Sequence, residues 1–179
     1  MSQAIADLRH EHDAILEALQ VLERMAEQAD RGAIATADLT AFLGFLREFV
    51  DRCHHGKEEG LLFPAMARAG LAEHGGFIDE LLAEHVQGRA LVQAMAQAGT
   101  PTINAAEFAA AATAYAEHLR AHIAKENDTF FPMAERLLDT PTMEALHQAF
   151  AEHEAKVIGA GRHEQLHQLL HQLKAKYLG

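Results

Sequence analysis

The chain has 179 residues, of which 49% are hydrophobic, and a formal net charge of -11. This length suits one globular unit, and the negative charge argues against nucleic acid or an anionic membrane surface as a partner. Cys53 is the single cysteine and excludes an intrachain disulfide, and the sequence has neither a signal-peptide pattern nor a run of membrane-spanning length, so we expect a cytoplasmic protein.

Good helix formers dominate the sequence, which has only four prolines, and this composition predicts an all-α fold. Apolar residues at helical spacing predict four long helices, at about 2–30, 36–63, 78–98 and 104–132. Gly70, Gly75 and Gly76 predict a loop between the second and third helices. Pro64 and Pro132 are expected to end or kink their helices, because proline lacks a backbone donor. The helices predict an antiparallel up-and-down four-helix bundle over residues 1–138.

Two more helices are predicted in a C-terminal extension, residues 139–179. The first follows the helix start Thr140-Pro141 and ends at Gly159, and the second spans about 162–178. Leucines lie on one side of the last helix, so we expect the extension to pack on the bundle or on a second copy of the chain in a homo-oligomer.

A motif occurs twice in the chain. His54-x3-Glu58 runs into Phe63-Pro64, and His122-x3-Glu126 runs into Phe131-Pro132, with Lys57 and Lys125 at the same place in each copy. A histidine and a glutamate four residues apart lie one turn apart on the same helix face. The first helix of each predicted hairpin carries a single histidine in its apolar seam, His12 in one and His85 in the other.

These polar side chains are predicted to meet in one small core. Each buried polar group without a partner costs about 1–3 kcal/mol, against a net stability of about 5–15 kcal/mol. Mutual pairing of histidine and glutamate is the structural alternative, but bound metal satisfies neutral imidazoles and carboxylates together. We therefore predict a metal site formed by His12, His54, Glu58, His85, His122 and Glu126.

This donor set predicts the class of metal and the number of ions. Imidazole and carboxylate suit iron, manganese, zinc or copper better than calcium or magnesium. Six large side chains crowd a single ion, so two ions fit better, each with two terminal histidines and with Glu58 and Glu126 bridging the pair. An oxo or hydroxo bridge would leave each ion an open position for a small ligand.

The motifs resemble those of the hemerythrin-like family, also called HHE cation-binding proteins, over about residues 3–135. The resemblance is carried by His12 in Leu8-Arg9-His10-Glu11-His12-Asp13, by Glu84-His85, and by the two His-x3-Glu motifs with their Phe-Pro endings. It implies a four-helix bundle that holds two iron ions in a di-iron centre of the Fe-O-Fe type. The donor set leaves zinc or manganese as alternative metals.

Two positions differ from the oxygen-carrying hemerythrins. Those proteins have a second histidine one turn before the residue matched by His85, where this chain has Leu81, and an aspartate where it has Glu126. The chain is therefore more similar to the six-ligand members, which include di-iron proteins of iron-sulfur cluster repair. The cysteine pair of those repair proteins has no counterpart here, since Cys53 is alone.

The resemblance predicts a protein that binds O2 or a related small species, NO or peroxide, for sensing, transport or protection. It favours a metal- and small-ligand-binding protein over a turnover enzyme, and no catalytic residue is predicted. One alternative is a di-iron enzyme, a peroxidase, an oxidase or an iron-sulfur cluster repair protein. The other is an iron-dependent regulatory or metal-buffering interaction module.

Several other residues are of interest. His118, one turn before His122, and Tyr115 are predicted to support the ligands from outside, with His118 as an alternative additional ligand. His10 and His55 adjoin predicted ligands and are expected to point away from them by α-helical geometry. The stripe of His163, His167 and His171 has the spacing of a surface zinc or nickel site, although a solvated helix face is the favoured interpretation.

Overall fold

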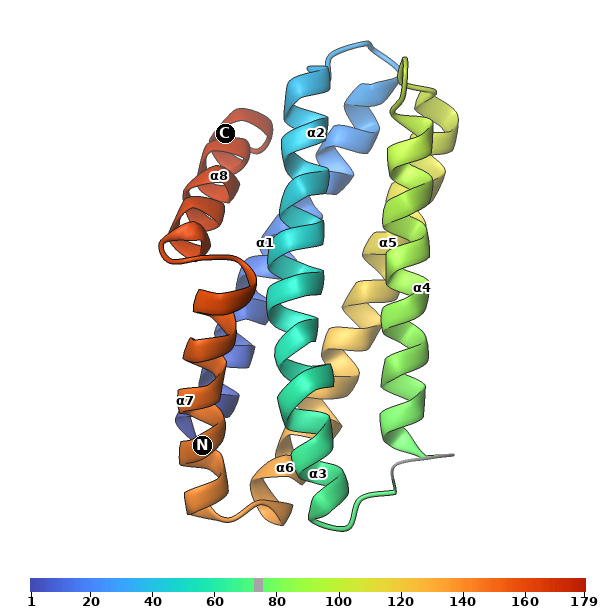
Figure 1. Cartoon of the computed structure of the whole chain (residues 1–179). Coiled ribbons are helices and arrows are strands. Elements are labelled where there is room, and N and C mark those ends of the chain that lie inside the picture. The colour runs from blue at the N-terminus through green and yellow to red at the C-terminus, as the bar shows by residue number, and fades with distance from the viewer. Residues whose placement is uncertain (73–75) are drawn as a thin grey trace.

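The structure is a computed structural model that describes residues 1–72 and 76–179, and this part of the chain is helical without strands (Figure 1). The predicted loop residue Gly75 lies outside the described residues. The α-helices are α1 (Gln3–Ala29), α2 (Thr36–Phe45), α3 (Phe63–Arg68), α4 (Phe77–Ala98), α5 (Ala105–Lys125), α6 (Phe131–Leu137), α7 (Thr140–Val157) and α8 (Arg162–Tyr177). Three π-helical segments join some of them, η1 (Leu46–His55), η2 (Glu58–Leu62) and η3 (Glu126–Phe130).

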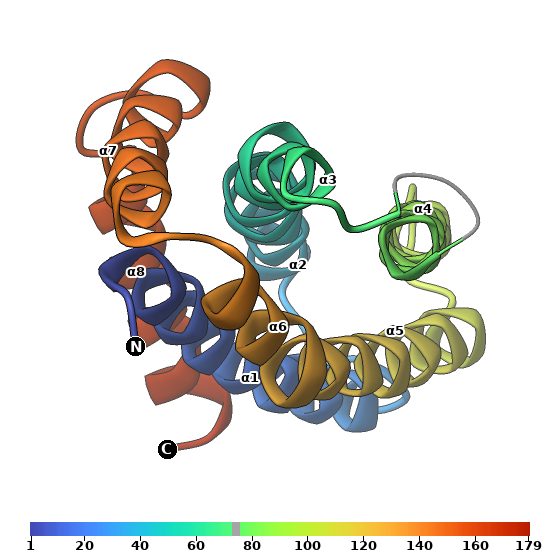
Figure 2. The same cartoon turned by 90° about the horizontal axis from the view of Figure 1, so that it is seen from below.

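The bundle is built from four helical rods. Figure 2 shows them in a view along the bundle. The first rod is α1, the second runs from α2 through η1 and η2 to α3, the third is α4, and the fourth runs from α5 through η3 to α6. Successive rods run in opposite directions. The predicted all-α bundle is therefore confirmed.

The two prolines do not end their rods, which continue to Arg68 and Leu137. The turn before each proline is π-helical: the Phe63 N–H donates to the Glu58 carbonyl, and the Phe131 N–H donates to that of Glu126, five residues back in each case. This wider turn makes room for the ring, which in an α-helix clashes with the carbonyl four residues back.

The core is divided into two apolar layers by a polar layer. Along α1, Ile5 and Leu8 belong to one apolar cluster and Ile15 and Leu19 to the other. Between them lie Glu11, His12, His54, His55, Lys57, Glu58, His85, His122 and Glu126, all less than 5% exposed. The apolar layers on both sides thus exclude bulk water from the polar layer.

The extension lies against its own bundle, with α7 and α8 end to end beside α1 (Figure 1). The Asp139 side chain caps the start of α7 by accepting a hydrogen bond from the Thr142 N–H at 3.0 Å. Met143, Leu146 and Phe150 of α7 enter one apolar layer, and Leu166, Leu170 and Leu173 of α8 enter the other. The apolar stripe of each helix is thereby buried within the same chain.

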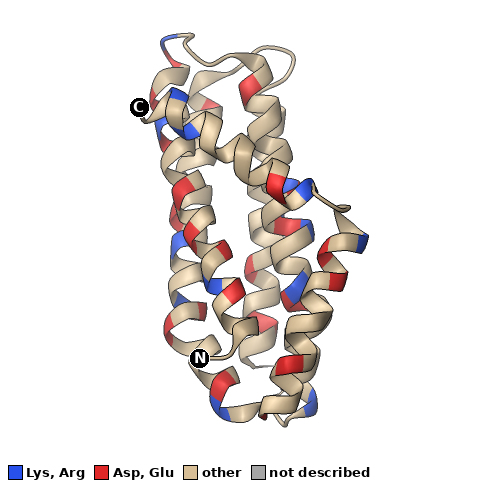
Figure 3. Cartoon of the chain, turned by 90° about the vertical axis from the view of Figure 1, so that its left-hand side faces the viewer, with Lys and Arg blue, Asp and Glu red and all other residues tan. Residues whose placement is uncertain are grey.

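Within residues 1–72 and 76–179, every helix is too short or too polar to cross a membrane. Acidic and basic residues are interspersed along the helices on the side shown in Figure 3.

Candidate metal centre

Two groups of buried side chains meet in the polar layer, and within each group the donor atoms lie within 4.8 Å of one another. The groups are His12, His54, Glu58 and Glu126, and His55, Glu58, His85 and His122. Glu58 belongs to both, so the groups share a carboxylate. The structure thus brings together all six residues that the sequence predicts as ligands, and each is at most 2% exposed.

The predicted histidines are each held at the outer ring nitrogen, Nδ1. This atom lies 2.7–3.0 Å from a side-chain oxygen, of Asn127 for His12, Glu11 for His54, Glu59 for His85 and Glu84 for His122. An oxygen acceptor at Nδ1 fixes the proton there and leaves the Nε2 lone pair free. The Nε2 atoms lie 3.2–3.5 Å from oxygens of Glu58 or Glu126. Metal-ligating histidines have this arrangement, with a carboxylate or carbonyl on one nitrogen and the metal on the other.

The residues that hold the histidines follow a pattern in the sequence. Glu11 and Glu84 each precede a seam histidine, and Glu59 and Asn127 each follow a motif glutamate. Every one of them reaches a histidine on a different rod. The two halves of the site are therefore related by an approximate two-fold symmetry.

The same symmetry explains the other repeated residues of the motif. Phe63 stacks on His85 and Phe131 on His12, with ring centroids 5.9 and 5.2 Å apart. Lys57 Nζ lies 2.5 Å from Oε1 of Glu11. The other oxygen of Glu11, Oε2, accepts a hydrogen bond from His54 Nδ1. Lys125 pairs in the same way with Glu84, which holds His122. The repeated phenylalanine and lysine thus position the histidines.

The two inner carboxylates face nitrogens from both halves. Glu58 Oε1 lies 3.5 Å from His54 Nε2, and its Oε2 lies 3.5 Å from His85 Nε2. Glu126 Oε2 lies 3.2 Å from His12 Nε2 and 3.3 Å from His122 Nε2. Among the described residues, none of the four carboxylate oxygens completes a hydrogen bond. A buried carboxylate without a hydrogen bond destabilises the folded state unless a cation binds to it.

The pKa shifts of Glu58, Glu126 and His54 agree with a cation between the two carboxylates. Burial, followed by the nearby Glu126 carboxylate, raises the pKa of Glu58 well above its usual value. Burial alone would also raise the pKa of Glu126, but His122 and His12 lower it to about 2. Burial lowers the pKa of His54 to about 4, so its imidazole is neutral at pH 7 and available as a ligand.

The donors fit two transition-metal positions. His12 and His54 with Glu58 and Glu126 would hold one ion, and His85 and His122 with the same carboxylates would hold the other. Imidazole nitrogen and carboxylate oxygen are ligands for iron, manganese, zinc or copper. This fit rests on the oxygens of Glu58 and Glu126, which complete no hydrogen bond among the described residues. They lie between the Nε2 atoms of two histidine pairs: those of His12 and His54 have no hydrogen-bond partner within the described part of the chain, and those of His85 and His122 lie 3.1 Å apart.

The expectation that His55 points away was wrong, because His55 joins the second group. Its ring stacks on that of His85 with centroids 3.8 Å apart, and it is 4% exposed. The expectation assumed α-helical geometry, but η1 is π-helical, and its larger number of residues per turn makes consecutive side chains diverge less. His54 and His55 therefore both face the centre. His10, in contrast, is exposed, as expected.

The other two supporting residues lie just outside the groups. His118 Nε2 donates to the Glu84 backbone carbonyl at 2.8 Å, which directs it away from the donor atoms. Tyr115 is 2% exposed and lines a cavity of about 220 Å³ that also reaches His55. Apolar side chains, among them Val50 and Val92, form much of the remaining wall.

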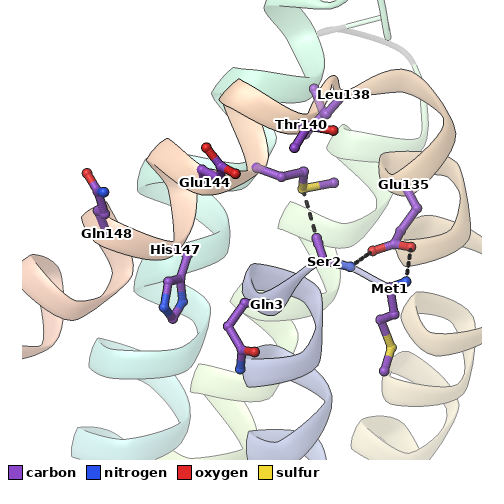
Figure 4. A pocket seen from close by; sticks show the side chains of 10 residues that line it. Met1, Ser2, Gln3, Glu135, Leu138, Thr140, Glu144, His147 and Gln148 are labelled. Atoms are coloured by element: carbon purple, nitrogen blue, oxygen red, sulfur yellow. Dashed lines mark hydrogen bonds and ion pairs between the residues drawn. The ribbon is translucent and has the colours of Figure 1, made fainter.

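A larger pocket, about 580 Å³, lies elsewhere, between the N-terminal residues and the chain around α6 and α7 (Figure 4). The Ser2 backbone nitrogen donates to Glu135 there, and the Ser2 hydroxyl contacts the sulfur of Met143. None of the residues that line it belongs to the two groups. Size alone therefore does not locate the chemistry of this protein.

Sequence reasoning missed the residues that hold the histidines, and it missed His55. A signal for the former was present, since an acidic or amide residue adjoins a predicted ligand in each rod and a lysine repeats in each motif. For His55 the sequence carries no comparable signal, because its orientation depends on the π-helical turn.

Together, the bundle and its central histidines and carboxylates define a class of helical-bundle proteins with a buried cation-binding site. The family model of the hemerythrin HHE cation-binding domain matches residues 3–134, and the chain belongs to this family. No curated protein and no solved structure matches the chain. The match ends before α7, so the C-terminal extension lies outside the matched residues.

Proposed function

We propose that this protein holds two iron ions at the centre and binds a small species there, O2, NO or peroxide, for sensing, transport or protection. Iron in such a centre supplies a redox-active position with affinity for small oxygen or nitrogen ligands. The contribution of the chain is to fix the donors, keep water out and limit what can reach the ions.

The observation that carries the proposal is the two-sided arrangement of the four histidines. Each Nδ1 is held by an oxygen from another rod, and each Nε2 faces a carboxylate oxygen that has no other partner among the described residues. A purely structural network would pair each inner carboxylate with an imidazole N–H at hydrogen-bond geometry. The Nε2 atoms lie 3.2–3.5 Å from the carboxylate oxygens, but none of these contacts completes a hydrogen bond. The close contact between His85 Nε2 and His122 Nε2, at 3.1 Å, does not involve the carboxylates and leaves them unsatisfied.

Access to the centre supports a small ligand. The cavity beside His55 has a volume of about 220 Å³, below the 300–1,000 Å³ or so typical of pockets for larger organic ligands. Its walls are largely apolar, and its exposed side carries the ion pair between Arg89 Nε and Asp51 Oδ1, at 2.7 Å. A diatomic molecule or peroxide fits in a cavity of this size, whereas a metabolite of ordinary size does not.

The test is the metal content per chain, by mass spectrometry, of protein produced with supplemented iron, together with its visible absorption spectrum in air. We expect about two irons per chain, as a dinuclear site requires, and charge-transfer bands in the visible range. Additions of O2 to the reduced protein, and of NO or peroxide, should change the spectrum and saturate at a fixed ratio of ligand to protein.

Two results would contradict the proposal. Protein without bound metal, or with a single zinc, would make the histidine–carboxylate layer a structural network. Continuous consumption of peroxide or NO with a reductant would identify an enzyme instead of a binding protein.

His55 makes the two metal positions unequal, since its counterpart in the second half of the chain is Ile123. The position of His85 and His122 has a third imidazole within reach, whereas that of His12 and His54 has none among the described residues. We expect the iron-loaded protein to show two distinct Mössbauer doublets. In His55→Ile the doublets should converge while both irons remain bound, because the other six donors are intact. Unchanged doublets in His55→Ile would show that His55 is not a ligand.

A further inference from the structure

Two histidines of the C-terminal extension form a second cluster, separate from the bundle centre. His163 and His167 lie one turn apart near the start of α8, and their Nε2 atoms are 2.9 Å apart. Both rings pack on Phe49 of η1, with centroids 5.2 and 5.1 Å away. Packing against the bundle thus fixes both rings with their Nε2 atoms toward one another.

A carboxylate lies on the far side of the cluster. Glu154 Oε2 of α7 lies 3.1 Å from His163 Nδ1, as an ion-pair contact without hydrogen-bond geometry, and His167 lies at the other nitrogen of the ring. A carboxylate in this place favours the proton on Nδ1 and raises the basicity of Nε2 as a metal ligand. Burial, with the neighbouring rings of His163 and His10, lowers the pKa of His167, which keeps its imidazole neutral.

The spacing of the two nitrogens is close to that of a bound ion. Two bonds of about 2.0–2.1 Å to a tetrahedral zinc place the nitrogens roughly 3.3 Å apart. The pair would have to open from 2.9 Å by only a few tenths of an ångström. The His163 side chain is 23% exposed, so water can complete the coordination.

A neighbouring group of possible donors is already satisfied by the protein. Glu11, Cys53, Glu154 and His163 also lie close together, but Lys57 Nζ is bonded to both carboxylates of that group. Burial raises the pKa of the Cys53 thiol to about 12, which disfavours the thiolate that a metal requires. The ammonium group of Lys57 therefore takes the place of a cation there, and the imidazole pair is the better candidate.

We propose that His163 and His167 form a second, surface metal site that takes a borderline divalent ion of the Zn²⁺ and Cu²⁺ class through two imidazole nitrogens. The Glu154 carboxylate, 3.1 Å from His163 Nδ1, adds negative charge beside the site and offsets the positive N-terminal end of α8. The site is half-exposed and has only two protein ligands, so it exchanges its ion more readily than the buried centre. It is independent of the iron-binding proposal, because it shares no ligand with the two central groups.

The test is a titration of the untagged, iron-loaded full-length chain with Cu²⁺, followed by electron paramagnetic resonance, and then competition with Zn²⁺. We expect one Cu²⁺ per chain with hyperfine splitting from two nitrogens, and its displacement by Zn²⁺. His163→Gln and His167→Gln should each weaken this binding at least about tenfold, as loss of one ligand of two requires. Iron content and the visible spectrum should stay unchanged in both.

His171→Gln is the matched control, since His171 lies one turn further along the same helix and is exposed. This variant should bind Cu²⁺ as the original chain does. A two-nitrogen signal that persists in both His163→Gln and His167→Gln, an equal loss in His171→Gln, or no binding by the original chain would overturn the proposal. The central donors also suit copper, but all three variants leave them intact, so copper bound at the centre would be retained equally in each. A loss confined to His163→Gln and His167→Gln therefore reports the surface site alone.

Discussion

Replacing Glu58 by alanine or glutamine is expected to remove both metal ions together. Its two oxygens face nitrogens of different groups, His54 Nε2 and His85 Nε2, each at 3.5 Å. Loss of this one carboxylate therefore deprives both positions of a donor, and we expect affinity to fall by more than the 10–100-fold or so typical of outer partners. Metal content per chain, measured after dialysis against a weak chelator, gives the result.

Glu59→Gln is the matched control for this experiment. Glu59 is the next residue, and it holds His85 Nδ1 from outside at 2.8 Å. Glutamine keeps an oxygen that can accept this hydrogen bond, so the control should retain both ions with a modest loss of affinity. A full complement of two ions in Glu58→Gln would contradict a shared carboxylate. Loss of metal in both variants alike would indicate a general disturbance of the bundle.

Replacing Lys57 by methionine is expected to give the largest loss of stability outside the metal ligands. Lys57 is 3% exposed, and its Nζ bonds Glu11 at 2.5 Å and Glu154 at 3.2 Å. Burial alone would raise the pKa of Glu11, but His54 and Lys57 lower it to about 2, so its carboxylate is charged at pH 7. Removal of one partner of a buried pair costs about 3–5 kcal/mol, which corresponds to a fall in Tm of about 6–20 °C for a chain of this size. Thermal unfolding followed by circular dichroism measures it.

Two comparisons separate charge from packing. Lys156→Met removes a lysine of α7 that is 77% exposed, with a weak ion pair to Glu152, and should leave Tm unchanged. The double variant Glu11→Gln, Lys57→Met removes both charges and should recover most of the loss, since no uncompensated buried charge remains. A double variant no more stable than Lys57→Met alone would show that lost packing, and not charge, is responsible.

The fold was predictable because helical periodicity is strong in this chain. Apolar residues at steps of three and four, with glycines at the ends, located the four rods and both helices of the extension. The prolines were harder to interpret, since Pro64 and Pro132 were expected to end or kink their rods. A π-helical turn before each one allows the helix to continue, and hydrogen bonding of that kind leaves no clear trace in residue type.

At the centre, the sequence could predict residues with a recognisable local spacing, but not contacts between residues far apart in the chain. The six predicted ligands stand out because polar residues interrupt apolar seams at a repeated spacing. Glu11 and Glu84 lie beside such residues, but their partners are on other rods, and a single sequence does not show which rods touch. His55 required the local backbone geometry itself. The structure adds to the sequence chiefly the contacts made between rods.

Those contacts have a consequence for how the chain selects its fold. Every rod carries both a central donor and a residue that holds a histidine of another rod, as α1 does with His12 and Glu11. A slip of one rod by a single residue would break at least two buried hydrogen bonds, at about 1–3 kcal/mol each. Apolar seams alone tolerate such shifts far better, because one leucine replaces another. The polar layer therefore specifies the register of the rods along the bundle axis. Because these hydrogen bonds do not involve a metal, they disfavour misaligned packings in the metal-free chain as well.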